Sequence, residues 1–451
     1  MLTSEHIAPT DTRTLVILAV SATAGALVEF YDFFIYGYAA ASAFPAIFFP
    51  NLAPSQALVF SFLAFGAGFP SRVVGAFVFG HFGDRTGRKF SFLLNIAIVG
   101  VTTCLTGLLP GYARWGLSAP VLLVVLRIVQ GIGLGGEFGG TSCLLAEFAA
   151  ERRSRAFWMS LANMGIPLGA IAASGMMLLM SKSFATTGWR TAMLLSVLIV
   201  IPALFARYKL TDSPLFERLK EREQLATFPS LAVIRKHLSS IVLVAVVISF
   251  MHMDGFVTGT YFISFMRFAG IPLATTAVIL MLGRVGDIAG VLVSGPFADL
   301  FQRRRAAFVA VVASTLLSYP FVIAVLNKQI WWVMVLQIVI SFFGIGVMHG
   351  LAPILASESF PTKFRYSGAG ISYNLAGILG GMTAPSLLAA RIGEDVYRKW
   401  YFVPIVYVIY CVAAIVSLVF IRETRDLKLW ELDNAEPAAA MEVDTSRSLA
   451  S

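Results

Sequence analysis

The segment Leu27 to Tyr38, LVEFYDFFIYGY, places two carboxylic acids in an otherwise apolar run. Glu29, Asp32 and Tyr36 are spaced i, i+3 and i+7, so they share one face if the run is helical. Two acids this close repel each other in a low dielectric, and one of them is expected to hold a proton unless an arginine lies nearby. Such a carboxyl group suits proton coupling, which we predict at Asp32 first and Glu29 second.

Three arginines also lie within apolar runs, where a charge at a helix centre costs roughly 2.5–3.5 kcal/mol. Arg72, Arg127 and Arg284 carry planar guanidinium groups that suit carboxylates, so they are predicted to bind an anion. One alternative stays open at this point. Arg72 or Arg127 would instead form a permanent ion pair with Glu29 or Asp32 that only holds helices together.

Polar residues repeat at helical spacing in several of these runs, which is typical of a wet cavity between helices. Asp287 follows Arg284 at i, i+3. The isolated histidines His252 and His349 are interpreted as structural. Beyond the arginines, the predicted substrate-binding residues are Tyr36, Gln130, Asp254, Tyr261 and Asn374.

The composition indicates a membrane protein, because 58% of the 451 residues are hydrophobic and 13% are charged, against about 25% charged in soluble domains. A helix that crosses the bilayer needs about 20 mostly apolar residues. The predicted fold is therefore an all-α polytopic membrane protein. Its twelve predicted spans are 15–44, 57–80, 91–112, 120–147, 156–181, 189–209, 239–267, 274–298, 307–326, 331–357, 367–392 and 401–421.

The basic residues predict orientation and exclude other classes of function. Most of the 34 Lys and Arg fall in loops on the side of the N-terminus, which predicts that both termini are cytoplasmic. The net charge of +9 is thus an orientation signal and indicates no nucleic-acid partner. The 3 Cys are far apart and suggest neither a disulfide framework nor a metal site. The N-terminal segment lacks the features of a signal peptide, so the first run is predicted to be retained.

The chain divides into two similar halves. Residues 125–155 align without gaps to 335–365, and GHFGDRTGRK (80–89) aligns to GPFADLFQRR (295–304). Repeated six-helix bundles suit a central site that opens alternately to each side. The predicted parts are an N-terminal bundle over 1–209, a cytoplasmic linker over 210–238, a C-terminal bundle over 239–421 and a disordered cytoplasmic tail over 422–451.

The motif GHFGDRTGRK resembles the loop signature of the major facilitator superfamily. More narrowly, VEFYDFFIYG, LRIVQGIGLGGEFGG and SESFPTKFRYSGAGISYNLA resemble the metabolite:proton symporter family. The resemblance implies two pseudo-symmetric six-helix bundles, and transport of shikimate, 2-oxoglutarate, citrate, aromatic acids, or proline and betaine. It also associates the acids of the first span with proton coupling. The loop ADLFQRRR departs from the family's Gly-Arg-Arg form, so no role is predicted for it.

Charged residues at the predicted cytoplasmic helix ends suit a latch between the halves. Asp84 and its basic neighbours lie in the first loop motif, and Glu147 and Glu358 end matching helices. Glu137, flanked by glycines in GGEFGG, is interpreted as a helix-pair contact or gate. The predicted gate residues are Asp84, Arg85, Arg88, Glu137, Glu147, Arg155, Glu358 and Arg365.

These features predict a secondary transporter of the inner membrane that carries a small organic anion with protons by alternating access. The alternatives are proton-coupled uptake of a zwitterionic osmolyte and efflux of a drug-like compound by proton antiport. No phosphate loop or nucleophile arrangement indicates an enzyme. We expect no cofactor besides the coupling proton, no partner beyond the bilayer and the substrate, and function as a monomer.

Overall fold

The structure is a computed structural model, and it describes residues 11–86, 88–150, 152–180, 182–208, 229–392, 395–427, 429 and 431. All regular elements within these ranges are helical. In the first half they are α1 (Thr12–Ser42), α2 (Phe44–Phe48), α3 (Pro54–Gly66), α4 (Gly68–Thr86), α5 (Arg88–Leu108), α6 (Tyr112–Trp115), α7 (Ser118–Gly135), α8 (Glu137–Phe148), α9 (Arg155–Ser160), η1 (Leu161–Met164), α10 (Gly165–Leu179), η2 (Phe184–Gly188), α11 (Trp189–Leu195) and α12 (Val197–Tyr208).

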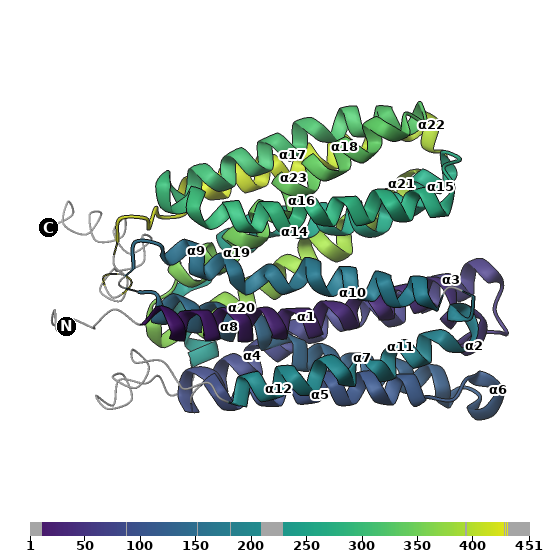
Figure 1. Ribbon diagram of the computed structural model, residues 1–451, viewed down its shortest axis with the longest axis horizontal. Helices are drawn as coiled ribbons and strands as arrows, with labels where there is room; N and C mark the ends of the chain where they lie inside the picture. Colours follow the sequence, from purple (N-terminus) through teal and green to yellow (C-terminus); the bar gives the residue numbers. More distant parts are fainter. Residues whose placement is uncertain are drawn as a thin grey trace, which may run out of the picture.

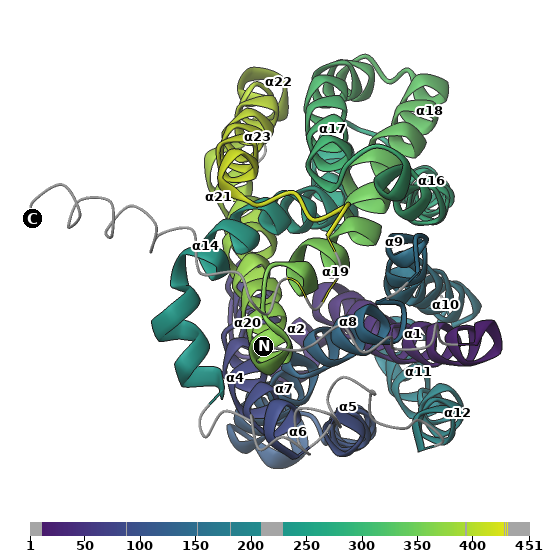
Figure 2. The same ribbon diagram turned by 90° about the vertical axis from the view of Figure 1, so that its left-hand side faces the viewer.

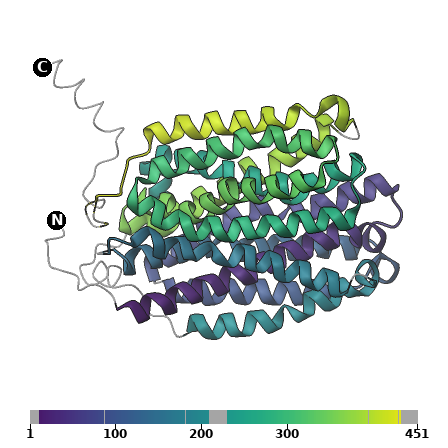
Figure 3. The ribbon, with the colours of Figure 1, turned by 45° about the horizontal axis from the view of Figure 1, so that its top comes forward.

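The second half repeats this all-helical pattern. Its elements are α14 (Pro229–Phe256), η3 (Val257–Tyr261), α15 (Phe262–Phe268), α16 (Leu273–Leu300), α17 (Arg303–Leu326), α18 (Ile330–Ile340), η4 (Ser341–Val347), α19 (Met348–Glu358), η5 (Thr362–Phe364), α20 (Arg365–Ala376), η6 (Gly377–Met382), α21 (Thr383–Ile392), α22 (Val396–Lys399) and α23 (Phe402–Phe420). The helices run side by side along the long axis of the molecule (Figure 1, Figure 3).

The described helices have the length and composition of membrane spans. Eleven are long and apolar enough to cross a bilayer, and Leu93–Leu108 is a shorter apolar helix at the place of the remaining predicted run. Large apolar side chains such as Leu179, Leu316 and Val419 point outward, which suits a surface covered by lipid rather than water. The prediction of an all-α membrane protein is confirmed, and the number of helices agrees with twelve spans.

The two halves meet mainly at one end of the bundle. This end, which we call the terminal end, is where α1 begins and α23 ends, at the left of Figure 1. The contacts between the halves run through α4 with α20, α8 with α19 and α20, and α9 with α16. Figure 2, viewed from this end, shows α8, α19 and α20 between the two groups of helices.

The connection between the halves and the tail are described in part. Residues 210–228 of the predicted linker and residues 428, 430 and 432–451 of the predicted tail lie outside the described residues. The helix α14 begins at Pro229, within the range predicted as linker, and the non-helical backbone of His237 (φ −129°, ψ 29°) divides it just before the predicted start of the seventh span. At the other end, Glu423 to Leu427 make defined contacts, so the expectation of disorder from residue 422 onward differs from the structure there.

Glycine lets α4 and α7 pack with their backbones almost in contact. A Cβ atom placed on Gly75 would lie 2.0 Å from the carbonyl oxygen of Ile132. Real Cβ atoms do not approach backbone that closely, so any larger residue would push the two helices apart. In contrast, a Cβ on Gly175 of α10 would meet nothing within 4 Å.

We therefore expect Gly75→Ala to lower the thermal unfolding temperature of the purified protein in detergent. Gly175→Ala is the control, because alanine there adds helix propensity without a clash and should leave that temperature unchanged or slightly raised. Circular dichroism measures both. Equal unfolding temperatures for the two variants would contradict the close packing of α4 and α7.

Candidate functional site

A cavity lies between the two halves and is lined by residues of both. It has a volume of about 660 Å³, which includes space open to solvent. Aromatic rings are the largest group of lining side chains, with α1, α4, α14 and α20 contributing Phe30, Phe33, Phe34, Phe69, Phe256 and Tyr373. Two arginines, Arg72 and Arg284, line the same space from opposite halves. An apolar cavity with a few convergent polar groups has the usual make-up of a small-molecule site.

Arg72 of α4 connects three helices at this cavity. Its guanidinium forms an ion pair with Glu29 of α1, and its Nε donates a hydrogen bond to Oδ1 of Asn374 at 3.1 Å. Asn374, on α20 of the other half, donates in turn to the carbonyl oxygens of Gly135 (3.1 Å) and Gly370 (2.8 Å). The structure thus places Arg72, Glu29 and Asn374 together, and Arg72 and Asn374 reach the cavity wall.

Asp32 belongs to a second ion pair that lies behind the cavity wall. Nη1 of Arg127 is 3.5 Å from Oδ2 of Asp32 and donates to Oε1 of Gln130 at 2.6 Å. Thr103 donates to Asp32 and accepts from Nε2 of Gln130 at 2.9 Å. The whole network is buried within the first half.

Aromatic rings separate this network from the cavity. The guanidinium carbon of Arg127 lies 4.4 Å from the ring centroid of Tyr36 and 5.7 Å from that of Phe33, a ring that lines the cavity. Arg127, Gln130 and Tyr36 therefore do not reach the cavity wall, and their predicted contact with substrate has no support in this geometry. An arginine is paired with each acid, as in the open alternative, but pairing alone does not assign these residues a purely structural role.

Asp254 and Tyr261 also lie away from the cavity. Asp254 is fully buried inside the second half, where it accepts hydrogen bonds from Tyr407 of α23 and from Ser314 of α17 at 3.1 Å. Tyr261 packs against the ring of Phe265 with the two centroids 6.1 Å apart. Both residues face neighbouring helices of the same half, so the predicted substrate contact has no support in this geometry for either of them.

Two histidines that are structural by interpretation of the sequence also belong to this site. His252 and His349 both line the cavity. Nδ1 of His349 lies 3.1 Å from Oδ1 of Asp287, whose Oδ2 is 3.5 Å from Nη1 of Arg284. The internal repeat carried a signal for His349, because the gapless alignment pairs it with Gly139. Where the first half has a glycine, the second half has a histidine, and its larger polar side chain needs space between the halves.

Charged residues join the halves at the terminal end. Nε of Arg155 donates to Glu358 at 2.7 Å, and Nη1 of Arg365 donates to Glu147 at 3.1 Å, so each ion pair links one half to the other. All four side chains are buried. We call these two ion pairs, with the carboxylate contacts described next, the latch.

Two aspartates of the loop motifs bind helix ends of the opposite half in a symmetric way. Asp84 accepts from the backbone N–H groups of Tyr366 (3.3 Å) and Ser367 (3.0 Å) at the start of α20. Asp299 accepts from those of Ala156 (3.2 Å) and Phe157 (3.1 Å) at the start of α9. A carboxylate at a helix N-terminus satisfies unpaired donors and complements the helix dipole. The loop ADLFQRRR therefore contributes a latch contact that its altered motif did not predict.

The other predicted gate residues are placed in part. The side chains of Arg85 and Arg88 lie outside the described residues. Glu137 is buried at the start of α8, where it lines a small space with Glu29 and Asn95 inside the first half, deeper in the bundle than the latch.

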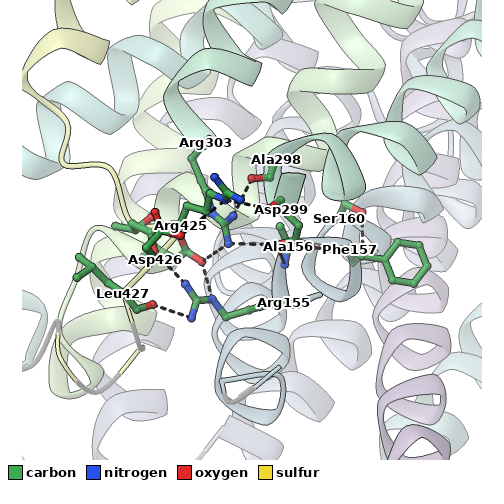
Figure 4. A network of polar contacts seen from close by, with 12 residues as sticks. Arg155, Ala156, Phe157, Ser160, Ala298, Asp299, Arg303, Arg425, Asp426 and Leu427 are labelled. Carbon is green, nitrogen blue, oxygen red and sulfur yellow. Dashed lines mark hydrogen bonds and ion pairs between the residues drawn. The ribbon is translucent and has the colours of Figure 1, made fainter. Parts of the chain in front are cut away.

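The start of the C-terminal tail completes the latch (Figure 4). Glu423 accepts from the backbone N–H groups of Arg303 and Arg304 at 3.0 Å each, and Thr424 donates to Glu358. Arg155 donates to the carbonyl oxygen of Leu427 at 3.2 Å. The sequence offered no helical or repeat signal for these contacts, because the tail has no counterpart in the first half.

Comparison with known proteins places these features in a family. The family model described as Major Facilitator Superfamily matches residues 24–385. The chain belongs to the Major Facilitator Superfamily. The match covers most of the chain, so this member is a secondary transporter and a multi-pass membrane protein rather than an enzyme.

Curated relatives and a solved structure agree with this membership. The chain is 35% identical over 403 residues to the inner membrane metabolite transport protein YhjE of Escherichia coli K12, covering 85% of this chain and 89% of that protein. It is 30% identical over 417 residues to the shikimate transporter of the same organism, covering 90% and 94%. The fold matches the proton:xylose symporter XylE with a TM-score of 0.75 at 15% identity, covering 94% and 100%. The predicted family resemblance is confirmed.

The latch of this superfamily member yields a test. Glu358→Gln removes the negative charge that faces Arg155 and Arg303, and breaking a buried pair by removing one partner costs about 3–5 kcal/mol. We expect the terminal end to open more often, so that a thiol placed in the cavity by Ile345→Cys reacts several-fold faster with an impermeant reagent added from that side. The native cysteines are replaced by serine in all variants.

Asp395→Asn is the matched control. Asp395 also forms an ion pair, with Lys399 at 3.1 Å, but its side chain is 58% exposed, and exposed pairs contribute little. With Ile345→Cys present in both proteins, the labelling rate of Asp395→Asn should equal that of the protein without this change. Unaltered labelling in Glu358→Gln would show that the Arg155–Glu358 pair does not hold the terminal end closed.

Proposed function

We propose that this transporter carries a small organic anion together with protons across the inner membrane, with the terminal end on the cytoplasmic side. The observation that carries the proposal is the cavity with one arginine from each half, Arg72 and Arg284. Guanidinium groups suit carboxylates, and the aromatic wall suits a ring or another flat apolar body. A substrate held by both arginines draws the halves together, as alternating access requires.

Proton coupling follows from competition for Arg72. An incoming carboxylate that binds Arg72 weakens the ion pair between Arg72 and Glu29, and a buried carboxylate that loses its cation is stabilised by taking up a proton. This geometry moves the first candidate for coupling from Asp32 to Glu29. Asp32 keeps Arg127 behind the wall of Phe33, where the substrate has no direct access.

A zwitterionic osmolyte is the second candidate, and the aromatic wall favours it specifically. A quaternary ammonium group is attracted to ring faces, so betaine would place its carboxylate on an arginine and its cationic end against the phenylalanines. The two candidates differ in one respect. The zwitterion carries no net charge, so its binding should depend less on the protonation of Glu29.

The experiment is uptake into proteoliposomes with an imposed pH gradient. The panel is benzoate, shikimate, 2-oxoglutarate, citrate and betaine, with benzamide as the neutral counterpart of benzoate. We expect at least one acid to accumulate against its gradient and benzamide not to. Accumulation of betaine alone would favour the second candidate, and no gradient-driven uptake of any compound would contradict the proposal.

The same assay separates the two acids. Glu29→Gln should abolish accumulation of the transported acid while exchange of labelled for unlabelled acid persists, because Arg72 stays available to the anion without a titrating partner. Asp32→Asn leaves Arg127 buried without its counter-charge and should lower both exchange and the thermal unfolding temperature. Accumulation at the unchanged rate in Glu29→Gln would rule out Glu29 as the coupling acid.

A further inference from the structure

The wall of the cavity in the second half carries three interacting groups that the coupling scheme above does not use. They are Arg284 and Asp287 of α16 and His349 of α19. We propose that His349, positioned by Asp287, is a second proton-linked contact for the substrate anion and acts together with Arg284. This proposal rests on the proposed function, because it assigns the anion and a proton to the same cavity.

The hydrogen bonds around His349 determine which ring nitrogen is available. Nδ1 lies 3.1 Å from Oδ1 of Asp287, a carboxylate that is fully buried. An ionised carboxylate only accepts, so Nδ1 carries the hydrogen and donates. Nε2 is then the nitrogen left for the cavity. It is a bare acceptor while the ring is neutral and a donor with positive charge once the ring takes up a proton.

The backbone at His349 is also anchored. Nδ2 of Asn163, in η1 of the first half, donates to the carbonyl oxygen of His349 at 2.7 Å. Asp287 therefore fixes the ring, and Asn163 fixes the backbone, at a point where the two halves meet. A side chain held this way is pre-organised to receive a ligand.

Arg284 has donors to offer at the same place. Its described contacts are the 3.5 Å ion pair with Asp287, which involves no hydrogen bond to Oδ2 of that residue, and the ring of Phe34 at 5.5 Å. Most of the hydrogen-bonding capacity of the guanidinium thus remains for an anion. Its counterpart in the first half, Arg72, is already engaged by Glu29 and Asn374.

The charges that surround His349 decide the sign of its effect. On α16, Arg284 and Asp287 cancel each other, so this wall is neutral when the ring is neutral and positive when it is protonated. From α4, Arg72 adds a positive charge that Glu29 of α1 balances. On α14, His252 faces the same cavity, and Asp254 lies behind with its hydroxyl partners. On α20, Tyr373 is neutral near physiological pH.

Protonation of His349 therefore strengthens anion binding, and a bound anion favours protonation of His349 to the same extent. This proton is a second one, bound at a group distinct from Glu29, since the two residues lie on different halves. Affinity for the anion should rise as the pH falls through the range in which a histidine titrates, between about pH 8 and 5.5. One charge-assisted hydrogen bond accounts for a rise of about tenfold.

His252 provides the matched control. It lines the same cavity, but its Nδ1 lies 3.3 Å from the carbonyl oxygen of Ile248 in its own helix and has no carboxylate partner in the described residues. Both histidines are changed to asparagine, whose amide nitrogen can replace Nδ1 as a donor without titrating. His349→Asn thus retains a donor for Asp287 but loses the Nε2 contact with the anion and the ability to charge, so the decisive readout is the pH dependence of affinity and not affinity itself.

The measurement is the half-saturating concentration for exchange at pH 8 and at pH 5.5, in proteoliposomes without a pH gradient. It uses each acid among benzoate, shikimate, 2-oxoglutarate and citrate that the unchanged protein takes up. We expect the roughly tenfold gain in affinity at pH 5.5 to disappear in His349→Asn and to persist in His252→Asn, whatever His252→Asn does to affinity itself. An unchanged gain in His349→Asn would overturn the proposal.

A second readout does not depend on transport. Carbon-13 NMR of histidine-labelled protein follows the 5 His, with the His349 signal assigned by its loss in His349→Asn. Adding benzoate at pH 6.5 should increase the protonated fraction of His349, and benzamide should not. A His349 signal that stays neutral from pH 8 to 5.5 would also overturn the proposal.

The outcomes separate this proposal from the proposed function. Loss of accumulation in Glu29→Gln with the pH dependence of exchange retained supports both assignments, because exchange does not require the first proton. If no acid of the panel is taken up, the proposed function fails, and the NMR titration alone decides whether His349 charges in the cavity.

Discussion

A charge buried among apolar helices needs a partner, and this requirement governs the arrangement of the whole molecule. Near the middle of the helices, Glu29 pairs with Arg72 and Asp32 with Arg127. At the terminal end, a second layer of ion pairs joins the halves, of which Arg365 with Glu147 is fully buried. Each pair is stable only while both members are present, so any event that removes one partner has to supply another.

This condition connects the cavity to the latch. In the middle layer, an anion and a proton together can replace the partners in one ion pair without leaving a charge unpaired. In the terminal layer, the halves separate only if the ion pair between Arg155 and Glu358 breaks and water solvates both side chains. The tail adds to the cost of that separation, because Arg155 also donates to its carbonyl oxygens. Anion binding in the middle layer and opening at the terminal end would thus both require a buried charge to exchange one partner for another.

The sequence predicted the fold for physical reasons, and it placed at helix ends the charged residues that the structure pairs across the halves. Hydrophobic runs of bilayer length leave little choice of fold, and the internal repeat indicated matching roles for Glu147 and Glu358 at equivalent helix ends. Spacing also showed correctly that Glu29 and Asp32 share a helix face. Spacing could not show that the ring of Phe33 would lie between Arg127 and the cavity, so that of the two paired arginines only Arg72 reaches the cavity wall.

The rest of the site depended on how each helix is rotated against its neighbours. Asp254 and Arg284 look alike in sequence, as charges within apolar runs, yet only Arg284 faces the cavity. His349 gained its setting from Asp287, 62 residues away in the chain, a proximity that helix packing alone establishes. No sequence pattern predicted the contact of Thr424 with Glu358, because the tail has no counterpart in the internal repeat.

The central claim is that substrate binding transfers a proton to Glu29 by taking Arg72 from it. Infrared difference spectroscopy of the purified transporter tests this directly, with the acid that it transports added at constant pH. The account predicts a new band of a protonated carboxylic acid in the unchanged protein, and loss of that band in Glu29→Gln. A band that persists in Glu29→Gln, or no band in the unchanged protein, would contradict it.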